Sequence, residues 1–190
     1  MAKTSIDSME IAGPLERLSR LMRGGEHEAG LNPAQWEALR FLSRANRFSN
    51  SPGAMTRFLG STKGTISQTI KALERKGFVI KSPRANEKRS ICLTLTEKGH
   101  ALLKNDPLQA LSKSLDDLSD KTRRRLAKGL RDLLAAELKR QEQPGFGTCA
   151  SCRYFREKGR ETDMAGPHQC MLFDAGLSAA DAQLICIEQA

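Results

Sequence analysis

Four cysteines near the end of the chain have the clearest potential for chemistry. Two residues separate Cys149 from Cys152, seventeen separate Cys152 from Cys170, and fifteen separate Cys170 from Cys186. The Cys-x2-Cys spacing lets two thiolates reach one metal ion from a tight turn. A zinc ribbon would close the site with a second Cys-x2-Cys pair, and this sequence has two single cysteines instead. The pattern predicts metal ligation, with a redox disulfide between Cys149 and Cys152 as the alternative.

A second group of residues has the composition of a nucleic-acid-binding surface. Residues 57–100 carry ten basic and three acidic side chains, a net charge of +7 within a 190-residue chain whose total is +9. Phosphate neutralisation supplies most non-specific affinity for nucleic acid, so this concentration of charge favours binding to DNA. Ten residues are our candidates for DNA contact: Ser61, Thr62, Lys63, Thr65, Ser67, Gln68, Lys71, Arg84, Lys88 and Arg89.

These ten side chains suit different parts of a duplex. The first three stand at the start of a predicted helix, where free N–H groups and the helix dipole favour a phosphate. The next three can hydrogen-bond to base edges in the major groove, where Gln68 can pair bidentately with adenine. Lys71 is better placed for a phosphate. The three in the predicted hairpin suit phosphates or a narrow A·T-rich minor groove.

The elements that position these residues follow from hydrophobic spacing and capping signals. Thr62 is a good N-cap, Ile66, Ile70 and Leu73 form one apolar stripe, and Gly77 suits a left-handed helix end. Residues 78–80 and 91–95 are typical of two short strands joined by a basic tip. Helices are also predicted over 9–23, from an Asn32 cap with proline next, and after residue 51. Helix, turn, helix and hairpin in this order predict a winged helix-turn-helix.

Helices on either side of this unit carry more apolar surface than it can cover. Thr96 can cap one helix, which breaks at Asp106-Pro107, and Ser119 or Asp120 begins a long helix with leucines on one face. We expect these helices to associate between two chains. The predicted fold is mainly α with a small β wing. Its parts are an N-terminal dimerisation helix (1–30), the winged helix-turn-helix (31–99), C-terminal dimerisation helices (100–143) and a metal-binding or cluster-binding extension (144–190). In that extension, Ser178 is expected to cap a short helix.

Residues 9–142 resemble the MarR family of transcriptional regulators. The resemblance lies in Asn32-Pro33-Ala34-Gln35-Trp36, in Thr65-Ile66-Ser67-Gln68, in LERKGFV at 73–79, and in Glu87-Lys88-Arg89 leading to LTEKG at 95–99. It implies a homodimer that places one recognition helix per subunit in successive major grooves of a pseudo-palindromic operator. It also implies that Arg89 reaches the minor groove. Members of this family commonly bind small aromatic or phenolic effectors, so a small-molecule effector is a further candidate partner.

The cysteine tail resembles another family. The sequences CASCRYF at 149–155 and CMLF at 170–173 are similar to the cluster-binding half of high-potential iron–sulfur proteins. This resemblance implies one [4Fe–4S] cluster held by Cys149, Cys152, Cys170 and Cys186 within an apolar and aromatic shell. Zn²⁺ is the second candidate cofactor, and unligated thiols are the third possibility. His168 could replace one cysteine, although a single histidine at this spacing is more typical of a surface residue.

Composition limits the remaining functions. The sequence has no apolar run of about 20 residues and no signal-peptide core at its start, which predicts a cytoplasmic location away from membranes. It has no phosphate loop and no defensible Ser/His/Asp arrangement, so we do not expect an enzyme. The leading hypothesis is a DNA-binding regulator controlled by redox or iron state through the tail. The alternatives are a regulator with a structural zinc tail and a small-molecule effector, and an iron–sulfur electron-transfer protein.

Overall fold

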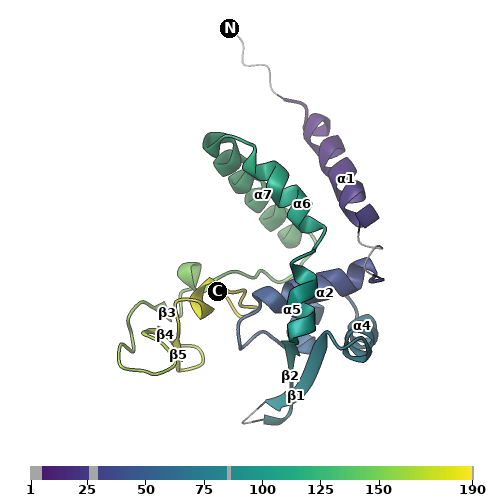
Figure 1. Cartoon of the computed structure of the whole chain (residues 1–190). Coiled ribbons are helices and arrows are strands. Elements are labelled where there is room, and N and C mark those ends of the chain that lie inside the picture. The colour runs from purple at the N-terminus through teal and green to yellow at the C-terminus, as the bar shows by residue number, and fades with distance from the viewer. Residues whose placement is uncertain (1–5, 26–29, 85–86, 190) are drawn as a thin grey trace.

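The computed structural model describes residues 6–25, 30–84 and 87–189, apart from the side chains of residues 87–89. Its winged helix-turn-helix comprises α2 (Pro33–Arg44), α3 (Pro52–Phe58), α4 (Lys63–Arg75) and the antiparallel strands β1 (Val79–Arg84) and β2 (Glu87–Leu95). Helix α1 (Ser8–Gly25) precedes it, and α5 (Glu97–Leu103), α6 (Leu108–Asp116) and α7 (Asp120–Arg140) follow. The predicted class, mainly helical with a small β wing, is confirmed (Figure 1). None of the helices among these residues has the length and apolarity needed to cross a membrane.

The helix ends lie where the capping residues predict them. Asn32 accepts the Gln35 N–H at 2.9 Å to begin α2, and Thr62 accepts the Thr65 N–H at 3.1 Å to begin α4. The hydroxyls of Thr96 and Ser119 cap α5 and α7 in the same way. Gly77, with a φ of +74°, ends the turn after α4 in the left-handed conformation that favours glycine. Each of these signals is local, so the helix boundaries follow from residues within about one helical turn.

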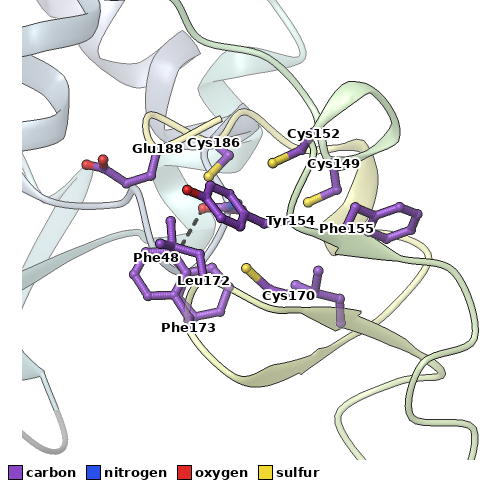
Figure 2. Close-up of a pocket in the computed structure, with 12 residues that line it drawn as sticks. Phe48, Cys149, Cys152, Tyr154, Phe155, Cys170, Leu172, Phe173, Cys186 and Glu188 are labelled. Carbon is purple, nitrogen blue, oxygen red and sulfur yellow. Dashed lines mark hydrogen bonds between the residues drawn. The ribbon is translucent and has the colours of Figure 1, made fainter. Parts of the chain in front are cut away.

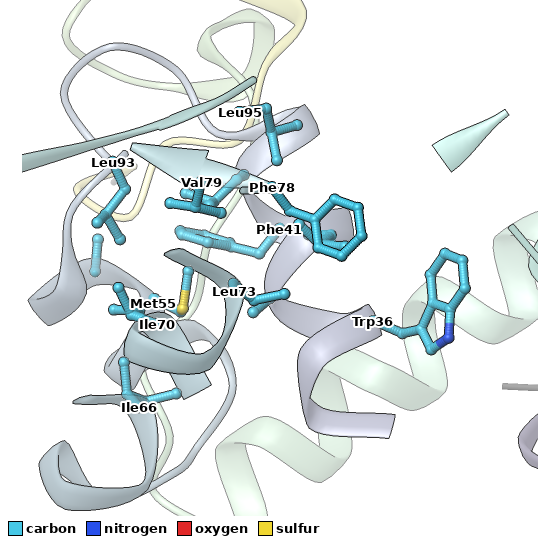
Figure 3. Close-up of a cluster of buried hydrophobic side chains, with 14 of the residues drawn as sticks. Trp36, Phe41, Met55, Ile66, Ile70, Leu73, Phe78, Val79, Leu93 and Leu95 are labelled. Atoms are coloured by element: carbon cyan, nitrogen blue, oxygen red, sulfur yellow. The ribbon is translucent and has the colours of Figure 1, made fainter. Parts of the chain in front are cut away.

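Each helix and strand of the winged helix buries one face in a common hydrophobic core (Figure 3). The predicted stripe of α4 is buried there, with Ile66, Ile70 and Leu73 packed among side chains of α2, α3 and the wing. This burial leaves the opposite side of α4 exposed. The wing strands run further toward their tip than predicted, because backbone pairing continues from Val79–Leu95 to Pro83–Ile91 although few side chains near the tip are apolar.

Helices α1, α6 and α7 extend away from the winged helix (Figure 1). Their apolar side chains remain well exposed, and Leu134 of α7 is 50% exposed. The start of α6 is fixed on α2 by an ion pair in which the Arg40 guanidinium donates to both carboxylate oxygens of Asp106, at 2.6 and 2.8 Å. Asp106 is buried, so this pair is shielded from solvent and sets where the helical arm leaves the domain.

The tail folds as a small unit beside the winged helix. A turn of 3-10 helix (Cys149–Ser151) leads to a three-stranded antiparallel sheet in the order β3 (Phe155–Arg156), β4 (His168–Cys170) and β5 (Ala175–Leu177). The helix predicted after Ser178 is wrong in extent. Ser178 does accept the Asp181 N–H at 3.0 Å, but only the 3-10 turn Asp181–Gln183 follows. Leu184 is extended, because the next residues pair with the winged helix.

Residues 185–188, which we call the docking segment, join the tail to the core of the winged helix. Ile185 and Ile187 are 5% and 4% exposed and belong to the same buried cluster as α4. Ile185 forms a parallel bridge with Ala45, at the end of α2. Phe146 packs against the same core from the segment after α7. The tail is therefore part of the packing of the winged helix.

We predict that Ile185→Ala destabilises the winged helix by about 2–5 kcal/mol, because it leaves a cavity in a shared core. Urea unfolding followed by the fluorescence of Trp36 measures this change, since Trp36 lies in the winged-helix core. Met164→Ala is the matched control on a fully exposed tail side chain and should change stability by less than about 0.5 kcal/mol. Equal stability of the two variants would contradict a shared core.

Candidate nucleic-acid interface and cysteine site

The outer side of α4 carries the polar side chains that sequence spacing predicts for it. Ser61 is half-buried, and the other six predicted positions are exposed: Thr62, Lys63, Thr65, Ser67, Gln68 and Lys71. The hydroxyls of Thr62 and Thr65 lie 2.9 Å apart at the start of the helix. Because the buried stripe fixes the rotation of α4, these side chains project together from one exposed side. The exposed side of α4 thus presents hydrogen-bonding groups and the amines of Lys63 and Lys71, on a helix whose N-terminal end is the positive end of its dipole.

A groove separates this side of α4 from the wing. It has a volume of about 420 Å³ and is lined by residues of α3, α4 and both wing strands, including Thr56, Ser67 and Ile91. The Lys81 amine of β1 forms an ion pair with the Glu74 carboxylate of α4 at 2.6 Å. The pair links wing and helix, so the two basic elements lie on one continuous surface.

The wing residues predicted for DNA contact are only partly placed. The Arg84 guanidinium turns toward the loop between α2 and α3, where it donates to the Arg47 carbonyl at 2.7 Å and to Asn50 Oδ1 at 3.1 Å. Lys88 and Arg89 lie on β2, but their side chains are outside the described part of the chain. A DNA role for these three residues stays a prediction, and Arg84 has a clear structural role within the free chain.

The four tail cysteines line one small cavity (Figure 2). Cys149 and Cys152 come from the first 3-10 turn and its end, Cys170 from β4, and Cys186 from the docking segment. Cys149, Cys170 and Cys186 are buried and Cys152 is half-buried. Their sulfur atoms lie around a shared space in the view of Figure 2. The remaining lining is mostly aromatic and aliphatic: Phe48, Tyr154, Phe155, Leu172, Phe173 and Leu177.

Burial, followed by the neighbouring thiols of Cys186, Cys170 and Cys152, raises the pKa of Cys149 to about 11. A positive centre among these sulfurs would offset both effects, because ligation to a metal stabilises the thiolate. Among the described residues, no three His, Cys, Asp or Glu side chains are grouped so as to hold a single metal ion. The four thiols therefore line one cavity and have the chemistry of a four-thiolate site, but the described structure does not group them as metal ligands.

His168 and Cys92 lie outside this set. His168 Nδ1 accepts the Lys158 N–H at 3.3 Å, and His168 is not among the residues that line the cavity. Cys92 lies on β2, where its sulfur accepts a hydrogen bond from Asn50 Nδ2 at 2.9 Å. The tertiary fold thus gives Cys92 a partner on the α2–α3 loop.

Sequence reasoning missed the residues that hold the tail on the winged helix. Arg57 of α3 forms an ion pair with Glu188 at 2.5 Å and donates to the Ile187 carbonyl at 3.3 Å. Ser49 Oγ accepts the Ile187 N–H at 2.9 Å. Apolar residues at 185 and 187 flanking Cys186 were the available signal, since alternation of this kind indicates an extended segment with two faces.

The fold and its exposed basic surface define a winged helix-turn-helix protein. Residues 29–90, which contain most of the winged helix, match a sequence model of the MarR family. The curated Transcriptional repressor MprA of Escherichia coli (strain K12) is 31% identical over 75 residues, which are 40% of this chain and 43% of MprA. This chain thus matches less than half the length of that relative. A match to regulators agrees with the prediction that the chain is not an enzyme.

Solved structures show the same fold. Streptococcus pneumoniae FabT, solved in complex with DNA, aligns with a TM-score of 0.57 at 22% identity, over 70% of this chain and 99% of FabT. NadR, solved in complex with 4-hydroxyphenylacetate, aligns with a TM-score of 0.57 at 20% identity, over 73% of this chain and 96% of NadR. The similarity of the tail to high-potential iron–sulfur proteins stays a prediction.

Proposed function

We propose that this chain is a cytoplasmic regulator of transcription that binds a specific double-stranded DNA sequence as a homodimer. The observation that carries the proposal is the exposed polar side of α4 beside a basic wing, on a MarR-type winged helix. The backbone N–H groups at the start of α4 would bind a phosphate and set the depth of the helix in the major groove. Gln68 and Ser67 would then meet base edges, and Lys71 would bind the flanking phosphate.

The exposed apolar side chains of α1, α6 and α7 support the homodimer. Leu126, Leu130 and Leu133 of α7 are each more than a third exposed, and Ile11 of α1 is more than half exposed. Apolar faces of this kind on adjacent helices favour association with an identical face on a second chain. A two-fold dimer would present two α4 helices to two half-sites, so we expect a pseudo-palindromic operator.

The tail supports control through the cysteine site. Its four thiolates would hold a [4Fe–4S] cluster, which supplies one-electron redox chemistry when bound. One observation supports a cluster over Zn²⁺: the cavity has an apolar and aromatic shell. On binding, the cysteines would supply thiolate donors, and the aromatic side chains around them would limit the access of water. DNA binding would then depend on redox or iron state.

A second form of control is favoured by a cleft of about 710 Å³ between α7, the end of α2 and the start of the tail. Its lining combines the basic residues Arg44, Arg131 and Lys139 with apolar side chains such as Phe58 and Phe146. Such a lining suits a small aromatic or aliphatic anion. This candidate applies if the tail holds a structural zinc, because control of DNA binding would then fall to an effector in the cleft.

For DNA recognition, we predict that Gln68→Ala loses about 1–3 kcal/mol of discrimination at one base pair and leaves the salt dependence of binding unchanged. Arg89→Ala should instead weaken binding to all sequences and reduce the salt slope by about one, as expected for a lost phosphate contact. Fluorescence anisotropy on a site selected from random duplexes measures both. Lys71→Ala is the matched control for a phosphate contact, and it should likewise weaken binding to all sequences and reduce the salt slope. Unchanged affinity in all three variants would remove this surface from the proposal.

For the dimer, we predict that Leu133→Glu raises the dissociation constant at least tenfold, because dimerisation would bury an unpaired carboxylate. Sedimentation velocity at micromolar concentration measures it. Arg124→Ala, on an exposed side chain of the same helix, is the control and should remain dimeric. A wild-type chain that sediments as a monomer would contradict the homodimer.

For the cofactor, we predict that protein purified without oxygen is brown, absorbs in the visible and contains about four iron and four sulfide per chain. Replacing the four tail cysteines by serine should abolish both the colour and the iron. Colourless wild-type protein with one zinc per chain would exclude the cluster and favour the effector cleft as the site of control.

A further inference from the structure

The docking segment makes Cys186 part of the winged helix as well as part of the cysteine site. Its neighbours Ile185 and Ile187 are buried in the winged-helix core, whereas Cys186 faces the cavity. The Cys186 N–H also donates to the Gly147 carbonyl at 2.8 Å. Successive side chains of an extended segment point to opposite sides, so a movement of the Cys186 sulfur pulls on two core residues.

The docking segment holds the loop between α2 and α3, residues 45–51, from the tail side. The Asn46 N–H donates to the Ile185 carbonyl at 2.9 Å, and the Ile187 N–H donates to Ser49 Oγ at 2.9 Å. Asn46 and Ser49 are 1% and 0% exposed. Buried polar groups are costly to leave unpaired, so the loop keeps this position only while the docking segment is in place.

Aromatic and cationic contacts add to this attachment. The ring of Phe48 stacks on Phe173 of the tail with 4.3 Å between centroids. Figure 2 shows this pair beside the cysteines. The Arg47 guanidinium lies over the Phe48 ring and donates to the Gly176 carbonyl of β5. The loop therefore contacts the sheet that carries Cys170 as well as the docking segment.

The same loop holds the wing from its other side. Arg84 of β1 donates to the Arg47 carbonyl and to Asn50 Oδ1. The Leu93 N–H of β2 donates to the Asn50 carbonyl at 2.8 Å, and Asn50 Nδ2 donates to the sulfur of Cys92. Both wing strands are thus bonded to a loop whose opposite side is bonded to the tail.

We propose that the ligation state of the four-cysteine site sets the position of the wing, through the docking segment and the α2–α3 loop. With the thiols ligated, Cys186 is held, the loop is fixed, and the wing is braced beside α4 in the arrangement that binds DNA. With the thiols free, the docking segment loosens and the wing loses its support. The inference rests on the proposed regulator function, since it names how that regulator would be controlled.

Hydrogen exchange of the full chain without DNA tests the coupling. In Cys186→Ser, amides of residues 45–51 and of the two wing strands should exchange at least about tenfold faster than in the wild type. Amides of α1 and α7 should not change. Met164→Ala, on the exposed surface of the tail, is the control and should match the wild type throughout. Wing amides that keep wild-type exchange in Cys186→Ser would overturn the proposal.

Two further variants separate this route from general unfolding. Arg84→Ala alone should release β1 from the loop, and adding Cys186→Ser should then speed exchange in β1 by less than about twofold, because the Arg84 link of that strand is already broken. Full additivity would overturn the route through the loop. Cys170→Ser should reproduce the wing effect, since it empties the same site from β4. Faster exchange throughout α2 and α4 in both cysteine variants would also overturn it.

The readout uses no DNA, so it is independent of the proposed function. A chain that binds no selected duplex but shows the coupled exchange would contradict only the regulator function. A chain that binds DNA with equal affinity in the wild type and in Cys186→Ser would contradict only the control by the tail.

Discussion

The winged-helix core is the constraint on which the exposed side of α4 and the cysteine site both depend. Parts of the chain that are far apart in sequence contribute side chains to this core. The α4 stripe enters the core from one side and the isoleucines of the docking segment from another. Burial of the stripe sets which side of α4 faces outward. Burial of Ile185 and Ile187 sets where Cys186 stands. One set of apolar contacts therefore orients the exposed polar side of α4 and the cysteine site at once, with hydrophobic burial as the common driving force.

Polar contacts then specify what the core alone leaves open. The Arg40–Asp106 pair sets the direction of the helical arm, and the Lys81–Glu74 pair sets the wing against α4. The α2–α3 loop adds hydrogen bonds on both of its sides, and those on the tail side are made by the buried residues Asn46 and Ser49. Buried polar groups form good hydrogen bonds in only one arrangement, so they define the position of a segment more sharply than apolar packing does. This is why the loop is suited to transmit a change in the tail to the wing.

Most of the fold could be predicted from the sequence, for local reasons. Caps at Asn32, Thr62, Thr96 and Ser119, the left-handed Gly77 and the α4 stripe each depend on residues within about one or two helical turns. The polar residues of α4 follow directly, since their exposure is the complement of that stripe. The wing was predicted too short, because backbone pairing near its tip needs no apolar pattern. The single 3-10 turn after Ser178 was also not predictable, because pairing of the next residues with Ala45 decides it.

By itself, the sequence determined the order of the helices, the exposed side of α4, the excess of positive charge around it, and the four thiols. Spacing along the chain and side-chain chemistry are sufficient for each of these. Only the tertiary structure decided that Ile185 and Ile187 enter the winged-helix core, that Arg84 turns to the α2–α3 loop, and that Asn50 reaches Cys92. These contacts join residues that are tens of positions apart or more, so no local pattern encodes them. The reason is physical: long-range partners are selected by shared burial, and burial is a property of the folded chain as a whole.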